Sequence, residues 1–435
     1  MSSNFNYTNR TGFIDAQRYG GLLIEARFYI LERGRVVGGT NYARVSNGSF
    51  TIDRNAEFRR TGEITLEVNP TIPPPLLMPC DPFSLIAPFG TELFIETGIA
   101  SSVPHPGSSN VVSEITWIPN GLFVIATTQA NDTGANTTVT LQLYDRAWTI
   151  AQRVLKNPWG FPHTATGNFV DEIMLLLNSV WNEQANVEPL QFNIVPTTAK
   201  VPVASYNQGS DPWQAALDMA AAVGYELYFD ALGNVVGHPI PNPAESAPTW
   251  NFTDDAVYVQ GNAGTGSAAL LGSAYSTPIE VSVKMTRDGL YNDVIVQGVG
   301  SGNGSTYNGN GLQTTTQPIL AEAADTNPLS PTYVNGGMGD VPNFLQSSLV
   351  VSGATAQAMA NNDLQQALSK VWTVTIGVAP NPVFDVNDVV IITRPRVGIN
   401  NARCVLDTIT HTFNYADIMY LTGRILSNDN PIQKG

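Results

Sequence analysis

Apolar and polar residues alternate along several short stretches of the chain, a pattern typical of β-strands that are buried on one face. In EITLEV at 63–68, the side chains of Ile64, Leu66 and Val68 would point to one face and the polar residues between them to the other. TTVTLQLYD at 137–145 and WTVTIGV at 372–378 alternate in the same way. We therefore expect each of these stretches to be a half-buried strand.

The first third of the chain contains further strand-like stretches separated by short turns: LLIEARFYIL (22–31), SFTI (49–52), TELFIETGI (91–99), EITWI (114–118) and LFVIATT (122–128). The last two flank Pro119-Asn120-Gly121, and Asn-Gly between apolar runs predicts a hairpin turn. So many short strands in so little chain favour a closed barrel or a sandwich.

After Asn157-Pro158 the apolar period becomes helical. Phe169, Ile173, Leu177 and Val180 would share one face of a helix. Asn168 is placed to cap its first turn, with Asp171 three residues on as in a capping box.

A second helix is predicted at 212–223. Asp211 would cap it, Pro212 would occupy its first turn and Gly224 would end it. The stretches 225–230 and 235–240 follow as a pair of strands, so this middle block is predicted to be a small α+β unit.

The last part of the chain returns to strand patterns, at IEVSVKM, VIVQGVG, 372–378, 388–393, 402–413 and 419–425. A helix is expected at 354–370, with Ser352 as its N-cap. Residues 301–345 are rich in Gly, Asn, Thr and Pro and are predicted to form a long loop or insertion.

The predicted fold class is therefore mainly β with an α+β insertion: two β-barrel domains and a small α+β domain. The expected domains are 1–157 for the first barrel, 158–250 for the α+β domain and 251–435 for the second barrel. The second barrel would carry the inserted helix 354–370 and the long loop 301–345.

Charge limits the kinds of partner. Of the 435 residues only 13% are charged, and the net charge is −15. Residues 1–60 hold nine arginines against five acidic residues, a net +4, so the rest of the chain carries −19. Such an acidic body repels nucleic-acid phosphates, which makes a nucleic-acid-binding enzyme an unfavoured class.

The cysteines and the apolar runs exclude further classes. Cys80 and Cys404 match no metal-binding spacing and are interpreted as reduced thiols, with a disulfide as the alternative. The N-terminal residues lack the apolar core of a signal peptide, and no run of 18 apolar residues predicts a membrane span. We expect the chain to fold in a cytoplasm, or to leave the cell within an assembly that needs no signal.

A glycine-rich stretch follows the predicted strand 294–296, with Gly298, Gly300, Gly302 and Gly304 in alternation. A dinucleotide-binding loop would need a third glycine at position 303 or 305 and a helix behind it. Those positions hold Asn303 and Ser305, and the residues that follow do not favour a helix. The stretch is therefore predicted to be a flexible loop and not a phosphate site.

The four histidines are His105, His163, His238 and His411, and none begins a His-Glu-x-x-His motif. His411 alternates with Ile409 and Phe413, which predicts a histidine in a core or an interface. No Gly-x-Ser-x-Gly elbow and no Gly-Lys-Ser/Thr loop occurs. A catalytic triad assembled only in space remains an open alternative.

Acidic and aromatic residues give no stronger site. Asp385-Val-Asn387-Asp388 resembles the start of a calcium loop but lacks the central glycine and closing glutamate, so a tight turn is predicted. Glu322/Asp325 and Asp254/Asp255 are interpreted as solvated surface. The seven tryptophans could stack on sugars, but most are predicted to be core. No catalytic, cofactor-binding or metal-binding residue is predicted, and no cofactor.

Taken together, several stretches resemble the tail hub or baseplate hub (minor tail) proteins of siphophages, particularly phages of actinobacteria. The resemblance lies in NGSFTIDRNAEFRRTGEITLEV, GTELFIETGI with IPNGLFVIATT, LQLYDRAWTI, LYNDVIVQGVG and WTVTIGVAPNPVFDVNDVVIITRP. These are patterns of strand and turn that cover most of the chain apart from 301–345. The resemblance implies two barrels of tail-tube fold, near 15–155 and 275–430, and no catalytic residue.

The same resemblance implies a structural virion protein at the tail tip, assembled in the host cytoplasm. A homotrimer would present six barrels in a ring. Its partners would be a tail-tube or distal tail ring protein, the tape-measure protein, and receptor-binding or tip proteins. Genomic DNA would pass through the ring without specific binding, because the wall is acidic.

Two other functions stay as alternatives. A tail-associated cell-wall hydrolase would need a catalytic cluster near His163 or within 301–345, and a sugar-binding adhesin would need exposed tryptophans. The basic residues 1–60 could dock on an acidic neighbouring ring, or their arginines could simply be scattered over strands.

Overall fold

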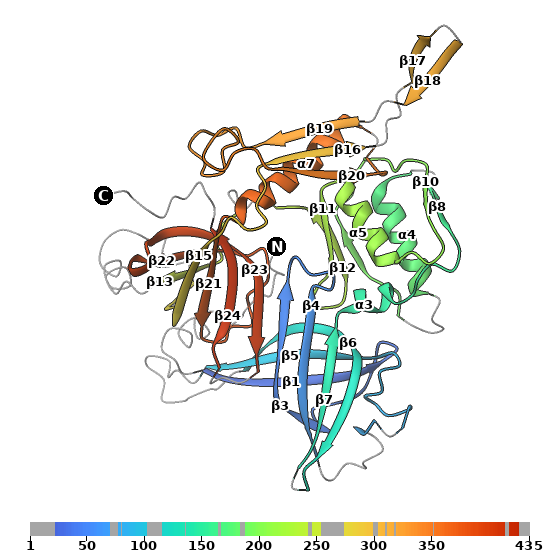
Figure 1. Cartoon of the computed structure of the whole chain (residues 1–435). Helices are drawn as coiled ribbons and strands as arrows, with labels where there is room; N and C mark the ends of the chain where they lie inside the picture. The colour runs from blue at the N-terminus through green and yellow to red at the C-terminus, as the bar shows by residue number, and fades with distance from the viewer. Residues whose placement is uncertain are drawn as a thin grey trace.

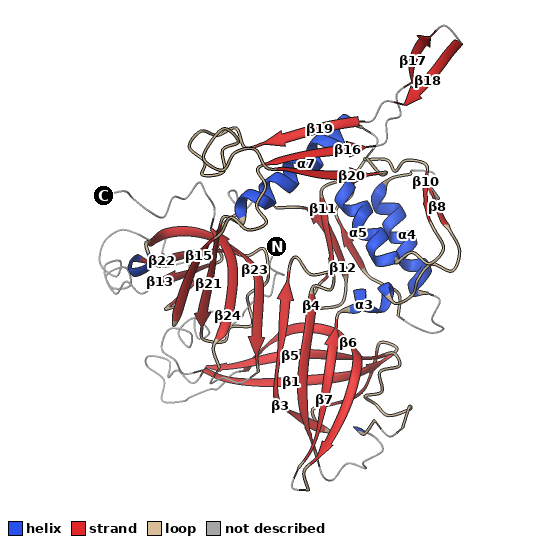
Figure 2. Ribbon diagram, in the orientation of Figure 1, coloured by secondary structure: helices blue, strands red, loops and turns tan. Residues whose placement is uncertain are grey.

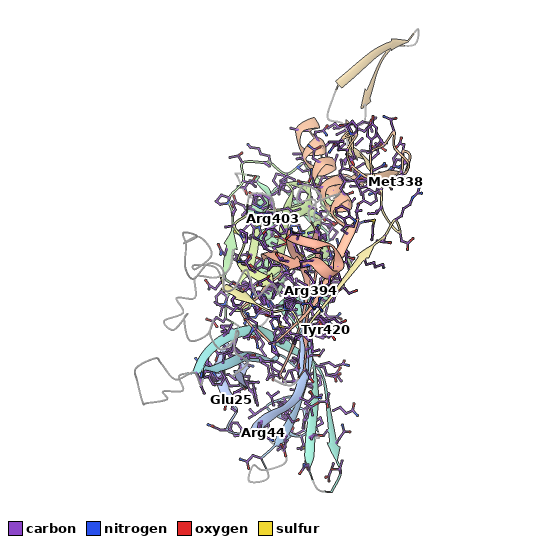
Figure 3. The ribbon with its side chains drawn as sticks, turned by 90° about the vertical axis from the view of Figure 1, so that its left-hand side faces the viewer. Glu25, Arg44, Met338, Arg394, Arg403 and Tyr420 are labelled. Carbon is purple, nitrogen blue, oxygen red and sulfur yellow. The ribbon has the colours of Figure 1, made fainter. Side chains whose placement is uncertain are left out.

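The structure is a computed structural model that describes residues 22–69, 77–79, 81–101, 115–134, 136–163, 167–182, 188–241, 246–253, 274–298, 303–308, 311–316, 319–350, 352–413 and 417–425. Strands dominate, and the helices gather in the upper part of the molecule (Figure 2). In side view the units are stacked along one axis, from Arg44 in the first barrel at the bottom to Met338 near the top (Figure 3).

The first barrel is built from seven antiparallel strands in the order β3-β4-β7-β6-β5-β1-β2. They are β1 (Leu22–Glu32), β2 (Arg35–Gly39), β3 (Ala43–Asp53), β4 (Arg60–Val68), β5 (Thr91–Ser101), β6 (Ile115–Asp132) and β7 (Thr137–Tyr144). The predicted alternation of β4 is confirmed, since Ile64 and Leu66 are buried and Glu63 is exposed.

The predicted hairpin at Asn120-Gly121 is wrong, because β6 runs straight through these residues. Gly121 lies opposite Ile95 and Pro119 opposite Glu96, so Asn120 is the extra residue of a β-bulge. Asn120 is buried, and its Nδ2 donates to Thr97 Oγ1. Glycine is favoured both in tight turns and at β-bulges, because it lacks a Cβ and tolerates unusual backbone angles. The Asn-Gly dipeptide therefore does not distinguish the two.

The middle unit contains α3 (Arg146–Ala151), β8 (Trp159–Phe161), α4 (Phe169–Trp181), β9 (Phe192–Ile194), β10 (Ala204–Tyr206), α5 (Pro212–Ala222), β11 (Tyr225–Phe229) and β12 (Val235–Pro239). Its strands form a β11-β12-β9 sheet and a β10-β8 pair. Both predicted caps are confirmed: Asn168 Oδ1 accepts from the Asp171 N–H at 2.8 Å, and Asp211 Oδ1 accepts from the Trp213 N–H at 2.7 Å.

The second barrel follows the order β14-β13-β22-β23-β24-β21-β15. Its strands are β13 (Trp250–Thr253), β14 (Ala274–Ser276), β15 (Glu280–Met285), β21 (Trp372–Val378), β22 (Val389–Arg394), β23 (Ile399–Thr412) and β24 (Met419–Ile425), with the short 3-10 helix η1 (Pro395–Val397) after β22. β13 pairs in parallel with β14 and β22, and the other pairs are antiparallel. The predicted fold class, two barrels with a small α+β unit, is confirmed.

A further unit, the inserted unit, lies between β15 and β21 in the chain. It comprises β16 (Asp293–Gly298), β17 (Asn303–Asn308), β18 (Gly311–Thr316), β19 (Ile319–Ala324), β20 (Pro342–Ser347) and α7 (Gly353–Ser369). Helix α7, capped by Ser352 as predicted, packs through Ala356 and Ala360 on Val294 and Val296 of the β19-β16-β20 sheet. The β17–β18 hairpin projects away from the body (Figure 1).

Segment 301–345 thus differs from the predicted long loop, because its described residues include three strands and the start of a fourth. The buried positions of β19 are Ala321 and Ala323. Alanine has a low β-propensity and gives only a weak alternation signal. The glycine-rich stretch was predicted to be a flexible loop, and this is wrong for its described end, because Asn303 and Gly304 begin strand β17 of the β17–β18 hairpin.

Candidate functional site

The two barrels are joined by one continuous sheet and one hydrophobic cluster. Strand β23 extends beyond the end of its pairing with β22. Its last residues, Thr408–Thr412, pair antiparallel with Ser49–Asp53 of β3. Phe50 stacks on His411 across this pairing, with ring centroids 4.4 Å apart. The prediction that His411 is a core or interface histidine is confirmed, and its burial, with nearby Arg60, lowers its pKa to about 3.

The turn between β3 and β4 carries charged side chains into the place where three units meet. The Arg54 guanidinium lies 3.4 Å and that of Arg59 3.3 Å from Glu226 Oε2, on β11 of the α+β unit. Asn387, before β22 of the second barrel, donates to Glu226 Oε1 at 2.7 Å. One carboxylate, on a side chain that is 13% exposed, therefore receives groups from both barrels, and we call this set of four residues the Glu226 junction.

Electrostatics keep the carboxylate of the Glu226 junction charged. Burial alone would raise the pKa of Glu226, but Arg59, Arg54 and His238 outweigh it and hold the pKa below its usual value. The Arg59 guanidinium also lies 3.6 Å from the ring centroid of Tyr228, a cation–π contact. Removing Glu226 would leave two buried guanidinium groups without this charge partner.

Further ion pairs lie within the second barrel and between the units. Arg424 Nε lies 2.6 Å from Asp407 Oδ2 within the second barrel. Arg60 of β4 contacts Asp385 Oδ2 at 2.8 Å. Arg146 of α3 binds both carboxylate oxygens of Glu92, on β5, at 2.7 and 2.8 Å, and donates to the Gly233 carbonyl at 3.1 Å. The relative placement of the units is thus fixed by charged contacts as well as by packing.

These contacts correct, for three of its arginines, the expectation that the basic segment 1–60 could dock on an acidic neighbouring ring. The side chains of Arg54, Arg59 and Arg60 are at most 9% exposed and have acidic partners in the same chain, so they are not free to meet an acidic neighbouring ring. Arg33 and Arg35, at the β1–β2 turn, are exposed. The arginines are evident in the sequence, but their partner Glu226 is not, because it lies 167 residues from Arg59.

Each of the two remaining described histidine candidates lies beside a glutamate. His163 Nδ1 lies 3.3 Å from Glu172 Oε2, and the His163 backbone N–H donates to Glu172 Oε1 at 2.6 Å. His238 Nε2 lies 3.5 Å from Glu226 Oε1. Among the described residues, no group of three or more His, Cys, Asp or Glu side chains could hold a metal. His105, Asp254 and Asp255 lie outside the described residues.

Of the described acidic candidates, Asp325, Asp385 and Asp388 take part in local hydrogen bonds. Asp385 and Asp388 form the predicted tight turn: the Asp385 N–H donates to Asp388 Oδ2 at 3.0 Å, and burial raises the pKa of Asp388 to about 7. Asp325 was expected on a solvated surface but is buried and accepts from Thr332 Oγ1 at 2.7 Å. Glu322 is exposed, as expected.

The cysteine and tryptophan candidates that the structure describes are buried or half-buried. Cys404 is a buried free thiol whose pKa is raised by burial, and Cys80 lies outside the described residues. All seven tryptophans are described and all are buried or half-buried, which argues against sugar stacking on exposed indoles. No helix among the described residues is long and apolar enough to cross a membrane.

No protein-family model matches the chain, and no curated protein matches it in sequence. Solved structures do match. A tail protein from Neisseria meningitidis MC58 superposes with a TM-score of 0.56 at 12% identity, over 94% of this chain and 98% of that one. The 43 kDa tail protein of prophage MuSo2 from Shewanella oneidensis gives 0.53 at 10% identity, over 93% and 99%.

The chain has the fold of phage tail proteins. The match extends over nearly the whole length of both chains, so it includes the two barrels and the α+β unit together. At these identities the likeness concerns the fold, and the resemblance that the strand and turn patterns indicated is confirmed at that level.

Proposed function

We propose that this chain is a structural protein of a phage tail, the hub at the tail tip. Three copies would form a ring of six barrels, which joins the tail tube to the tip. The observation that carries the proposal is the edge-to-edge union of two barrels in one chain, through the β3–β23 pairing and the Glu226 junction. A chain built from two fused barrels supplies six barrels with three copies.

The proposed domains are 1–157 and 251–435 for the barrels and 158–250 for the α+β domain. The ring would contact a tail-tube or distal tail ring protein, the tape-measure protein, and receptor-binding or tip proteins. It would be assembled in the host cytoplasm, and a siphophage of actinobacteria is the proposed source. The chain would act without a covalent reaction.

The charge of the chain supports a passage for DNA. Outside residues 1–60 the chain carries −19, and like charge keeps a polyanion from adhering to a channel wall. Genomic DNA would therefore slide through the ring without being held at any site.

Copy number tests this proposal. Native mass measurement of the purified chain should give a trimer, and quantitative analysis of tail particles should give three copies per tail. A single copy per tail, or copies in the hundreds, would rule out the hub.

A further inference from the structure

The two barrels repeat one plan. Read from one end, the strand order is β3-β4-β7-β6-β5-β1-β2 in the first barrel and β15-β21-β24-β23-β22-β13-β14 in the second. The first five positions also have the same chain order and the same antiparallel pairing in both barrels. These five strands can therefore be aligned one to one.

An irregularity in the ladders fixes the residue register of this alignment. The β6–β7 pairing skips Ala126, between Ile125 and Thr127. The β23–β24 pairing skips Asp407, between Leu406 and Thr408. In both barrels the last residue paired to the preceding strand, Val124 or Val405, lies two positions before the bulge. Ala126 and Asp407 are thus equivalent.

Carrying this register across the sheet makes β15 the equivalent of β3. Leu143, paired to the residue before the bulge, lies opposite Gly62, which lies opposite Phe50. In the second barrel the same path runs from Gly423 to Val374 and on to Val283. Val283 therefore corresponds to Phe50, and Met285 corresponds to Ile52.

The equivalent strands differ in what covers their edges. The outer edge of β3 is covered by β23 of the same chain, and Phe50 and Ile52 are each 2% exposed. Among the described residues β15 pairs with β21 alone, and Val283 is 40% and Met285 64% exposed. Apolar side chains that point toward the core face are thus left uncovered on β15.

The strand equivalent to β23 has a matching open edge. Strand β22 pairs with β23 as far as Val405. From Thr408 onward, β3 pairs with the same edge of β23. In the first barrel, β5 pairs with β6 as far as Val124. Beyond that residue, the same edge of β6 has no strand partner in the part of the chain that the structure describes. The loop before β5 contacts this region through Thr128, whose Oγ1 donates to the Ile86 carbonyl at 2.6 Å. In Figure 1, β15 and the β6–β7 hairpin lie on opposite sides of the barrel pair.

We propose that β15 of one copy pairs antiparallel with residues 127–131 of β6 in a second copy, repeating between chains the β3–β23 contact within the chain. The register places Met285 opposite Thr128, Lys284 opposite Gln129, Val283 opposite Ala130 and Ser282 opposite Asn131. This assignment rests on the ring proposed above, and it names the edges that close it.

The side chains fit this register. Val283 and Ala130 would meet on the core face, as Phe50 and His411 do within the chain. Lys284 and Gln129 would meet on the outer face, where both are already exposed. No like charges face each other directly, and backbone hydrogen bonds would fill both open edges. The contact is head-to-tail, so it forms a closed ring when the rotation between copies allows.

Cysteine cross-linking tests the register. The double variant Gln129→Cys/Lys284→Cys places two exposed thiols directly opposite each other, within disulfide reach. Its matched control, Gln129→Cys/Val283→Cys, is shifted by one residue, which turns the second thiol to the other face. With a thiol oxidant, we expect at least tenfold more reducible covalent trimer from the first variant than from the control or the unmodified chain.

Two further measurements separate the possible failures. Equal mixing of the single variants Gln129→Cys and Lys284→Cys should stop at covalent dimers, because each chain then has one new thiol. If the unmodified chain is trimeric by mass but the paired variant links no better than its control, the strand assignment is wrong and the hub proposal stands. If the unmodified chain is monomeric by mass, both proposals fail.

Discussion

Strands β3 and β15 hold equivalent places in the two barrels but have opposite surroundings. The β3 edge is buried beneath β23, with aromatic stacking at Phe50, whereas β15 presents Val283 and Met285 to solvent with Lys284 between them. A lysine on an open strand edge discourages uncontrolled pairing, while the apolar residues beside it still favour a specific partner. The edge is completed within the chain at β3, and in the proposed ring it would be completed by a second copy at β15.

The connections after these strands differ as well. Between β3 and β4 a short turn carries Arg54 and Arg59 to Glu226, so the first barrel anchors the α+β unit. Between β15 and β21 the chain inserts a whole unit with its own small hydrophobic cluster. The connection after the first strand therefore binds the α+β unit in the first barrel and carries the inserted unit in the second barrel.

The largest expected effect is at the covered edge. Phe50→Ala would leave a cavity beneath His411 and lower the free energy of unfolding by about 4 kcal/mol. Val283→Ala, its counterpart on β15, should cost less than about 1 kcal/mol in the isolated chain, because the side chain is already 40% exposed. Urea unfolding of both variants checks this, and equal losses would contradict the difference between the covered edge of β3 and the open edge of β15.

A somewhat smaller loss of unfolding free energy is expected at the Glu226 junction. Glu226→Gln keeps the side-chain shape but removes the carboxylate that Arg54 and Arg59 share, and leaves Arg54 with Asp407, 3.9 Å away, at a cost of about 3 kcal/mol. Limited proteolysis should then cut the β3–β4 turn faster than in the unmodified chain. Glu63→Gln, on the exposed face of β4, is the control and should change neither stability nor cleavage. Indistinguishable behaviour of the two variants would show that the Glu226 junction does not hold the units.

The barrel–barrel contact should weaken in acid through His411. Its pKa is about 3 in the folded chain against an ordinary value of 6.5, so the unfolded chain takes up the proton first as the pH falls. The stability that the neutral ring supplies is complete above pH 6.5 and is lost toward pH 3, by about 1.4 kcal/mol per pH unit. Burial raises the pKa of Asp145 to about 6 and of Asp388 to about 7, which acts in the opposite direction.

The His411 contribution is therefore measured as a difference. The unfolding free energy of the unmodified chain, minus that of His411→Gln, should fall steadily as the pH is lowered from 6.5, since the aspartates contribute equally to both. A difference that stays constant over this range would mean that His411 is protonated in the folded chain.

Local patterns predicted local structure well. The alternation at Ile64 and Leu66 and the caps at Asn168, Asp211 and Ser352 depend on neighbouring residues, which the sequence displays directly. Asn120-Gly121 misled because a bulge and a turn share one local signal, and only the opposing strand β5 distinguishes them. Strand β19 escaped notice because its buried positions are alanines.

The site could not be predicted in the same way. Arg54, Arg59, Glu226 and Asn387 come together only after three units have folded, and no local pattern links positions so distant in the chain. The equivalence of β3 and β15 is likewise carried by strand order and bulge position, not by similar residues: Phe50 and Ile52 correspond to Val283 and Met285. A periodic sequence repeat was therefore not visible.

The smallest effect on the isolated chain is expected at the open edge, where the effect on assembly should be clear. Met285→Gln changes a side chain that is 64% exposed, so the stability of one copy should stay within about 0.5 kcal/mol. If Met285 is covered in the ring, the loss of its burial should weaken association by about 1–2 kcal/mol, or roughly tenfold in dissociation constant. Leu329→Gln, at a loop residue that is 92% exposed, is the control and should leave both quantities unchanged. Mass measured over a dilution series separates the two variants: the Met285 variant should dissociate at about tenfold higher concentration than the control, and superimposable dilution curves would remove β15 from the interface.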